Sequence, residues 1–391
     1  MQKLIIILTG IIFLSFSLMV LSCKKEPDND AIDKHERLKL EFQKAINSAK
    51  TSDPSLRSIY VRISIPDKAF CWEYAIGNAK PNVNAKIGDR FMSASIGKIF
   101  TSLLILKLQE EGLLQLDDSI GKYLPSTITD GLSIYNSIDY SKKITIRQLL
   151  SHRSGLDDYF ESGEVNQNGF TPFMQELVEN KEHLWTPIEI INFYKSHFQS
   201  IASPADTFKY SDTNYQLLGL IAESVTGKQF NLLLWEKVLS PLQMNHTYLF
   251  GYDVPRPTGE DKTSIAYFDD LTLDFPAMRF DWAGGGLMTN CKDLEMGLKS
   301  IVNSTFLNNI SQAEMMQWHE VQAGTYYGLG LTKLLYGYGT NEYLMGHEGT
   351  TGSFLFYSPK HGAYITGTVN QFLNNSAILN DLLIVLENNS L

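Results

Sequence analysis

The stretch from Phe91 to Gly112, FMSASIGKIFTSLLILKLQEEG, constrains the fold more than any other part of the chain. It opens with small and polar residues and continues as an apolar run in which Lys107 is the first charged residue after Lys98. A helix that is apolar on nearly all sides must be buried, so we predict a central helix here. Gly112 lies where the C-terminus of such a helix favours a positive φ. The apolar positions are Ile99, Phe100, Leu103, Leu104, Ile105, Leu106 and Leu108.

Ser95 and Lys98 lie three residues apart at the start of this helix, a spacing that puts both on one face. The free N–H groups and the dipole of a helix N-terminus stabilise a serine alkoxide. Together with burial they disfavour an ammonium, which would lower the pKa of Lys98 and make it a usable base. The pair is therefore a candidate nucleophile and base. The alternative is that Ser95 only caps the helix while Lys98 extends to water.

The same spacing occurs a second time, in Ser119-Ile120-Gly121-Lys122. This copy follows two aspartates and runs into Tyr123-Leu124-Pro125, so no long apolar helix follows it. We predict a solvated loop or a short helix at this place. The spacing alone therefore does not identify an active site.

Length and composition predict a large packed core, since the chain has 391 residues of which 43% are apolar. This is enough for one large domain or two packed lobes. The formal net charge of −10, without a compensating basic run, argues against a nucleic-acid partner. Cys71 and Cys291 form neither a disulfide framework nor a metal-ligand spacing, and whether they pair stays open. We predict no metal and no cofactor.

The first thirty residues indicate a targeting segment. Lys3 precedes an almost uninterrupted apolar run from Leu4 to Leu21, and Cys23 follows directly before polar residues. This arrangement resembles the bacterial lipoprotein signal, in which the cysteine is lipidated and becomes the mature N-terminus. It predicts a signal peptide over 1–22, a tether over 23–33 and a lipid-anchored protein on the periplasmic or cell-surface side of the bacterial envelope. An ordinary cleaved signal and an uncleaved membrane anchor are the alternatives.

Strand-like segments lie at both ends of the remaining chain, with helical patterns between them. Residues 58–65 and 69–76 are rich in β-branched and aromatic side chains and flank Pro66-Asp67, which predicts a β-hairpin. We predict an α+β domain over 34–390, with an α+β lobe from about 34–95 and 290–390 and a helical lobe from about 96–289. The other predicted helices are 34–50, 144–151, 188–198, 213–225, 293–302 and 378–386; the other predicted strands are 327–335, 343–345, 353–357 and 363–369.

Two further motifs lie far apart in the chain. Tyr210-Ser211-Asp212 lies on a loop leading into an apolar helix, and His347-Glu348-Gly349 opens a strand. Each motif alone would more simply indicate packing residues. Together with Ser95-Ile96-Gly97-Lys98 they resemble, in the right order, the motifs of the penicillin-recognising serine hydrolases. That family includes class C β-lactamases, D-alanyl-D-alanine carboxypeptidases, other penicillin-binding-protein-like enzymes and esterases. Residues 149–156 and the segment 284–288, Gly-Gly-Gly-Leu-Met, also resemble family segments, and the resemblance covers about residues 35–390. The three glycines at 284–286, the glycine run, predict a place where backbone passes closely or turns sharply.

The resemblance implies a fold and a mechanism. The fold is an antiparallel sheet flanked by helices, with a mostly helical lobe beside it. In the mechanism Ser95 attacks a carbonyl to form an acyl-enzyme, Lys98 helps to remove its proton, and Tyr210 carries a proton to the leaving group and activates water. The N–H groups of Ser95 and Thr350 hold the oxyanion, and His347 supplies a hydrogen bond or a positive charge.

Asp212 and Gly349 are the residues that the resemblance places against the substrate, a small molecule or peptide with an ester, amide or D-amino-acid bond. Asp212 stands where the family commonly has Asn, and an ionised carboxylate cannot donate a hydrogen bond to a substrate carbonyl. Glu348 stands where enzymes acting on β-lactams often have a hydroxyl, and its charge would repel a substrate carboxylate. Both differences favour an esterase or a peptidase over an efficient β-lactamase. We expect the loops 161–169 and 255–270 to shape specificity.

Other hydrolase classes are disfavoured because the chain lacks their motifs. Gly-x-Ser-x-Gly, His-Glu-x-x-His and the phosphate-binding Gly-x-x-x-x-Gly-Lys-Ser/Thr are all absent from the sequence. The rival hypothesis is a non-catalytic envelope lipoprotein that binds peptidoglycan fragments or β-lactams in the same cleft. Such a protein could be acylated once but would not turn over.

Overall fold

The computed structural model describes residues 34–255, 262–337, 339, 341–372 and 376–389. Their largest element is an antiparallel sheet with the order β11-β12-β13-β14-β15-β16-β1-β2-β3. The N-terminal hairpin closes against the last strand, since β1 pairs with β16 and Tyr60 lies opposite Thr368. The predicted α+β fold class is confirmed. The strands of this sheet are β1 (Ser58–Ile65), β2 (Phe70–Lys80), β3 (Val83–Asn84), β11 (His319–Gln322), β12 (Thr325–Tyr327), β13 (Thr332–Leu335), β14 (Tyr343–Gly349), β15 (Ser353–Ser358) and β16 (Ala363–Thr368).

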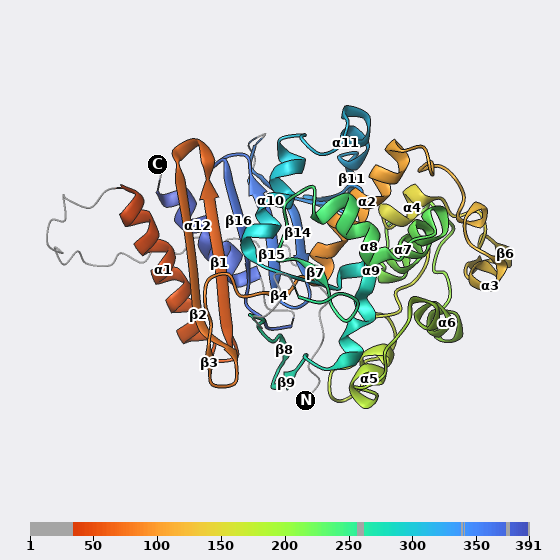
Figure 1. The fold of residues 1–391 in the computed structure, drawn as a ribbon, viewed down its shortest axis with the longest axis horizontal. Coiled ribbons are helices and arrows are strands. Elements are labelled where there is room, and N and C mark those ends of the chain that lie inside the picture. The colour runs from red at the N-terminus through yellow and green to blue at the C-terminus, as the bar shows by residue number, and fades with distance from the viewer. Residues whose placement is uncertain (1–33, 256–261, 338, 340, 373–375, 390–391) are drawn as a thin grey trace, which may run out of the picture.

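Helices from the two ends of the chain cover one face of this sheet (Figure 1). They are α1 (Lys34–Ser52) and α12 (Ser376–Asn388), which pack against each other. Leu38, Phe42 and Ile46 follow each other at four-residue spacing and are buried, so one stripe of α1 meets the core while the rest faces water. The other face carries α10 (Cys291–Val302), which contacts β1, β15 and β16.

The central helix predicted from the sequence is α2 (Gly97–Glu110), and α7 (Asp212–Thr226) and α9 (Trp282–Gly285) pack against it. Its apolar side chains are fully buried, and Gly112 has the predicted positive φ, 73°. The helix is therefore buried along most of its length, and only its last turn is partly exposed. The remaining helices are α3 (Ser126–Thr129), α4 (Ile146–Leu150), α5 (Pro172–Glu179), α6 (Pro187–His197), α8 (Phe230–Leu234) and α11 (Asn309–Met315).

The segment 327–335 contains two strands, so the prediction of a single strand is wrong there. β12 ends at Tyr327, the chain reverses near Gly330, and β13 begins at Thr332. Gly330 has a φ of 78°, and a Cβ there would lie 2.2 Å from Ser102 Oγ of α2. Leu329 and Leu331 are buried in the core around α2 instead of alternating across a sheet, which explains the apolar run. β11, which the sequence analysis does not predict, pairs with β12 at the edge of the sheet.

A small sheet ties the residues before α2 to the glycine run. In it β4 (Phe91–Met92) pairs with β10 (Leu287–Thr289), which in turn pairs with β7 (Tyr248–Leu249). The turn that carries Ser95 thereby lies beside residues 284–286. Two short hairpins complete the strands: β5 (Ile134–Tyr135) with β6 (Ile138–Asp139), and β8 (Tyr267–Phe268) with β9 (Leu271–Thr272).

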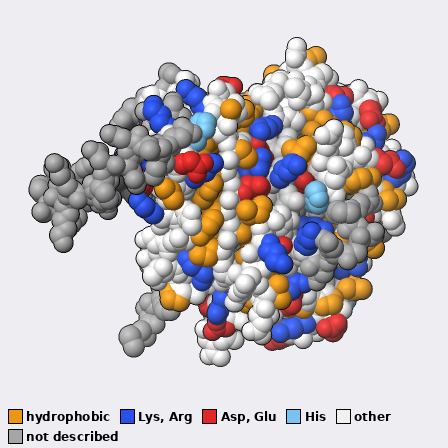
Figure 2. Space-filling model, turned by 60° about the vertical axis from the view of Figure 1, so that its left-hand side comes forward, with side chains coloured by type: hydrophobic (Ala, Val, Ile, Leu, Met, Phe, Trp, Pro, Cys, Tyr) orange, Lys and Arg blue, Asp and Glu red, His pale blue; other side chains and the backbone are white. Residues whose placement is uncertain are grey.

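The surface over α1, β1 and β2 carries acidic and basic side chains interspersed with apolar ones (Figure 2). The predicted signal peptide, tether and lipidated Cys23 lie outside the described residues, as does part of the loop 255–270, namely 256–261. Among the residues that the structure describes, no helix has the length and apolar character needed to cross a membrane. Cys71 and Cys291 are both free thiols, the first exposed and the second buried.

Candidate active site

The turn before α2 holds Ser95 in a strained and fastened backbone. Ala94 has a φ of 46°, in the left-handed region that a non-glycine residue adopts at a cost of about 1 kcal/mol or more. Ser353 Oγ donates to the carbonyl of Ser93 (2.6 Å) and Thr351 Oγ donates to that of Met92 (2.9 Å). These bonds fix the β14–β15 turn, which carries Thr350, against the turn that carries Ser95. The two predicted oxyanion donors are thus on neighbouring backbone segments.

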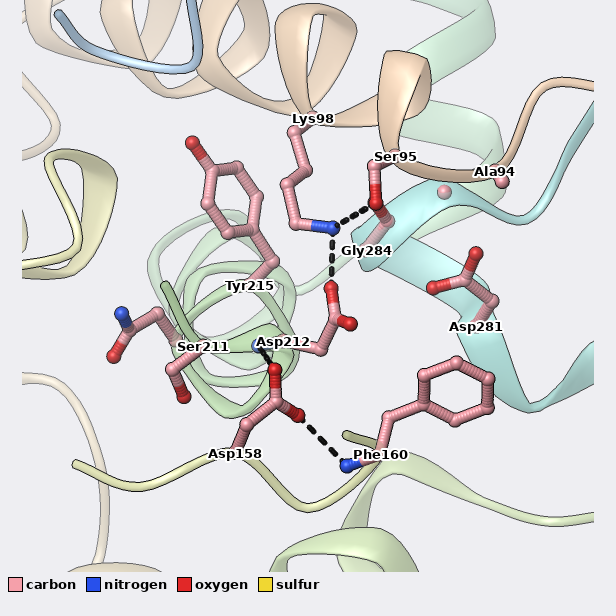
Figure 3. A network of polar contacts seen from close by, with 12 residues as sticks. Ala94, Ser95, Lys98, Asp158, Phe160, Ser211, Asp212, Tyr215, Asp281 and Gly284 are labelled. Atoms are coloured by element: carbon pink, nitrogen blue, oxygen red, sulfur yellow. Dashed lines mark hydrogen bonds and ion pairs between the residues drawn. The ribbon is translucent and has the colours of Figure 1, made fainter. Parts of the chain in front are cut away.

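Lys98 is completely buried, and its ammonium faces three acceptors (Figure 3). Nζ donates to Ser95 Oγ (2.9 Å) and to the carbonyl of Gly284 (3.0 Å), and it forms an ion pair with Asp212. The rings of Tyr210 and Tyr215 flank it, with centroids 5.0 and 5.5 Å from Nζ. All three N–H groups of an ammonium are therefore satisfied, and two aromatic rings add to its stabilisation.

The expectation that Lys98 has a lowered pKa is wrong. Burial does lower the pKa, as predicted, but the carboxylates of Asp212 and Asp281 together outweigh it, and the pKa is raised above that of an ordinary lysine. The effects that lower the pKa of Lys98, burial and the helix N-terminus, could be predicted from the local sequence. The two carboxylates that raise it belong to distant segments of the chain. Lys98 is thus an ammonium in the resting site.

Asp281 is a site residue that the sequence analysis missed. It directly precedes α9, and its carboxyl lies over the glycine run beside Asp212 (Figure 3). Burial and the Asp212 charge raise the pKa of Asp281 to about 7, against the opposite effect of Lys98. A Cβ on Gly284 would lie 2.6 Å from Asp281 Oδ1, and one on Gly285 would lie 2.3 Å from the carbonyl of Ala94. The predicted close passage of backbone at the glycine run is confirmed, and an acid three residues before it was the available signal.

Asp212 is the first residue of α7, with its carboxylate turned to Lys98. Its N–H donates to Asp158 Oδ2 (3.1 Å), and Asp158 Oδ1 accepts from the N–H of Phe160 (2.7 Å; Figure 3). Burial and the charge of Asp212 raise the pKa of Asp158 well above the ordinary range. Asp158 therefore holds the start of α7 in place, while the role of Asp212 against a substrate stays a prediction.

Tyr210 lies on the loop before α7, as predicted, with its hydroxyl buried in the site. Burial and the charge of Asp212 raise its pKa far above that of an ordinary tyrosine, and the nearby Ser95 hydroxyl lowers it by less. It is consequently a neutral phenol at rest, able to give a proton and unable to take one.

His347 lies on β14 facing Tyr210, with ring centroids 6.1 Å apart. Burial and the charge of Lys98 lower its pKa to about 3. Of the two roles that the resemblance implied for His347, a positive charge is therefore disfavoured at neutral pH, and a hydrogen bond is left.

Glu348 and Gly349, the two residues after His347, lie in different surroundings. Glu348 lies opposite Phe354, whose side chain belongs to the core under α1 and α12, so Glu348 projects from the other face of β14 than His347 does. Burial raises its pKa to about 7. Both facts weaken the expected repulsion of a substrate carboxylate by Glu348. Gly349 contacts the turn that carries Ser95, and a Cβ on Gly349 would lie 2.3 Å from the carbonyl oxygen of Ser93.

The chain belongs to the β-lactamase family, whose model matches residues 70–388. This confirms the resemblance found in the sequence and, for the family, the prediction of a serine hydrolase. Protein flp of Staphylococcus aureus strain MW2 is 27% identical over 76% of this chain, and the match spans 56% of that protein's length. The chain thus spans little more than half of the curated relatives it matches first.

Solved structures give the same fold. A D-stereospecific amidohydrolase from Streptomyces sp. superposes with a TM-score of 0.72 at 23% identity, covering 88% of this chain and 97% of that one. A D-amino acid amidase from Ochrobactrum anthropi SV3, complexed with D-phenylalanine, superposes with a TM-score of 0.74 at 19% identity, covering 90% of this chain and 100% of the other. Both are evidence on the fold alone.

Proposed function

We propose that this protein hydrolyses amide or ester bonds of small molecules or short peptides through an acyl-enzyme on Ser95. The observation that carries the proposal is the 2.9 Å hydrogen bond from a fully buried Lys98 Nζ to Ser95 Oγ, beside an ion-paired Asp212. A buried lysine that donates to a serine hydroxyl at a strained turn, and is itself paired with a carboxylate, is placed to activate that hydroxyl.

Acylation needs an acceptor for the Ser95 proton, and the resting protonation states restrict the choice. Lys98 is an ammonium and Tyr210 a phenol, so neither can accept it directly. Asp212 is the base in contact with Lys98. As Ser95 Oγ bonds to the carbonyl carbon, its proton passes to Lys98 while Lys98 gives one to Asp212.

The remaining steps use the N–H groups of Ser95 and Thr350 to hold the oxyanion. Tyr210 then gives its proton to the leaving nitrogen or oxygen as the carbonyl bond to that atom breaks. The proton held by Asp212 returns through Lys98 to Tyr210. Water then attacks the acyl carbon, and its proton passes to Lys98 while Lys98 gives one to Asp212. Tyr210 gives its proton to Ser95 Oγ as the ester bond breaks, which releases the acid product. The proton on Asp212 returns through Lys98 to Tyr210.

The proposed substrate class is amides of amino acids, D-amino acids included, and short peptides. One structural neighbour is named a D-amino acid amidase and another a D-stereospecific amidohydrolase. In addition, Asp212 offers only acceptors where a β-lactam or carboxypeptidase substrate would use the donor of an asparagine. Activity on β-lactams should be low. Lipid attachment at Cys23, in the bacterial envelope, is part of the proposal and is supported by the apolar run from Leu4 to Leu21 directly before it.

The test is intact mass spectrometry of a protein starting near residue 30 after treatment with a fluorophosphonate probe, with Ser95→Ala in parallel. A single adduct on the wild type alone is expected. Turnover of D- and L-amino acid amides and p-nitrophenyl esters is then measured. An adduct without turnover would favour the binding lipoprotein, and no adduct on either form would contradict Ser95 as nucleophile.

Lipid attachment has its own test. The full-length protein is expressed in a bacterium with an alkyne-labelled fatty acid, beside Cys23→Ala. Label on the wild type and none on the variant is the expected result. Equal labelling, or none on either, would overturn the anchor.

A further inference from the structure

Three buried side chains form a hydrogen-bonded row behind Tyr210. His152 Nε2 lies 3.2 Å from the hydroxyl of Tyr327, and that hydroxyl lies 3.2 Å from His347 Nε2. His152 follows α4, Tyr327 ends β12 and His347 lies on β14, so three separate segments meet here. All three side chains are buried, and none of them takes part in the proton transfers proposed above.

The hydrogen bonds assign one tautomer to each imidazole. The N–H of Ser211 donates to His152 Nδ1 (3.1 Å), so Nδ1 carries no proton and Nε2 must be the donor to Tyr327. The hydroxyl of Tyr327 accepts this bond and directs its own proton to His347 Nε2. His347 then carries its proton on Nδ1, which donates to the carbonyl of Glu348 (2.6 Å).

Burial, together with the charge of Lys98, keeps both rings neutral. Burial and the Lys98 ammonium lower the pKa of His152 well below the ordinary value and that of His347 to about 3. The titratable groups that face His347 are Lys98, His152, Tyr210 and Tyr327. A proton added to His347 would have to displace the bond from Tyr327.

The row also holds Tyr210. The Tyr210 ring packs on His152 with centroids 4.2 Å apart and meets Tyr327 edge-on at 6.2 Å. In addition, His152 Nδ1 accepts a hydrogen bond from the backbone N–H of Ser211, the residue directly after Tyr210. His152 therefore fixes both the ring and the following backbone of the proposed proton carrier.

We propose that Tyr327 is a positioning residue of the hydrolytic reaction: it accepts from His152 and donates to His347, and by fixing both rings it holds Tyr210 against Lys98 and Ser95. The kinetic part of this inference rests on the proposed function. The tautomer assignment does not, because it concerns the resting protein.

The first test is NMR on the protein labelled with ¹⁵N-histidine, with His152 and His347 signals assigned by single substitutions. The expected wild-type result is Nε2–H for His152 and Nδ1–H for His347. The opposite tautomer at either ring would overturn the proposal without any substrate, and would leave the function proposal untouched.

The second test is Tyr327→Phe, with Tyr326→Phe, a half-buried neighbour on the same strand, as its control. Loss of the hydroxyl removes a donor to the neutral His347, so its pKa should rise and its tautomers should mix. On any substrate found, kcat should fall by about 10- to 100-fold with KM within about threefold, and the acid limb of the pH profile should move to higher pH.

Unchanged tautomers together with unchanged kcat in Tyr327→Phe would overturn the positioning role. A circular dichroism spectrum and melting temperature close to those of Tyr326→Phe show that the variant is folded. If Tyr327→Phe does not fold, the wild-type tautomer measurement still decides the assignment on which the role depends.

Discussion

The chain contains the Ser-x-x-Lys spacing twice, and the two copies have opposite surroundings. Lys98 is fully buried between Ser95, Gly284 and Asp212, whereas the side chain of Lys122 is 58% exposed and pairs with Asp118 at 2.7 Å. The second copy is a single 3-10 turn at the surface, as its sequence context predicts. Each lysine has a carboxylate partner, so the main difference between the copies is how far the lysine is exposed to water.

The comparison shows that burial, and not the Ser-x-x-Lys spacing, gives the two lysines different electrostatic environments. In water the interaction between an ammonium and a carboxylate at contact is about 1 kcal/mol, and inside a protein it is several times larger. The Asp212 carboxylate therefore raises the pKa of the buried Lys98, while water screens the pair of Lys122 and Asp118. Each copy supplies a matched control for the other.

The largest expected effect is the difference in activity between substitutions of the two serines. Ser95→Ala should lower kcat by at least about 1,000-fold, because no other group can form the acyl-enzyme, while Ser119→Ala should keep wild-type activity. Steady-state assays on the best substrate and probe labelling measure both. Residual turnover by Ser95→Ala above about 0.1% of wild type would contradict this difference between the two serines.

The two lysines should differ in stability as well as activity. Lys98→Met leaves Asp212 buried without a counter-ion and should lower the free energy of unfolding by about 3–5 kcal/mol, with loss of activity. Lys122→Met removes an exposed charge and should leave both the urea midpoint and the activity unchanged. Equal midpoints for the two variants would show that the Lys98 ion pair is not buried in solution.

The two aspartates test the proton route. On the proposed route the proton from Ser95 ends on Asp212 in the wild type, so no net proton loss is needed near pH 7. In Asp212→Asn neutral Lys98 must act as the base, so activity at pH 7 should fall about tenfold and recover as pH rises. The pKa of Lys98 should be lower in the variant than in the wild type, because Asp281 alone then opposes the effect of burial.

Asp118→Asn is the matched control and should leave the profile of kcat/KM against pH unchanged. An Asp212→Asn profile that coincides with the wild-type one would contradict Asp212 as the proton acceptor, and would direct attention to Asp281 instead.

The smallest expected effect concerns Asp281, for which the second copy has no counterpart near Lys122. Its folded-state pKa of about 7 lies above the unfolded value, so the folded protein binds the extra proton and loses stability as pH rises from about 4 to 7. Asp281→Asn should therefore stabilise the protein at pH 8 by about 1–2 kcal/mol and have little effect at pH 4.

Asp117 is the control with the opposite sign. Its hydrogen bond from Arg147 lowers its pKa, so the stability it contributes is present at neutral pH and is lost as pH falls. Asp117→Asn should lower the melting temperature slightly at pH 7 and not at pH 3. Thermal melts of both variants between pH 3 and 8 measure these trends, and parallel curves for Asp281→Asn and wild type would contradict the raised pKa.

The sequence by itself determined those features that depend on local periodicity. The apolar run from Ile99 to Leu108 requires a buried helix whatever surrounds it, and the β-branched segments around Pro66 form a hairpin with Ser64 opposite Cys71. The order of the three motifs indicated the family. The predicted strand over 327–335 failed because its apolar residues pack on α2 around a reversal at Gly330, which periodicity alone cannot show.

Only the tertiary structure decided the electrostatics of the site. The pKa of Lys98 depends on carboxylates that α7 and the start of α9 bring to it, and Asp281 shows no catalytic pattern in the sequence. His152 and Tyr327 meet His347 only through the folding of distant segments. Helix and strand formation depend on near neighbours in the chain, whereas protonation and tautomers depend on near neighbours in space, and folding is what makes those two sets different.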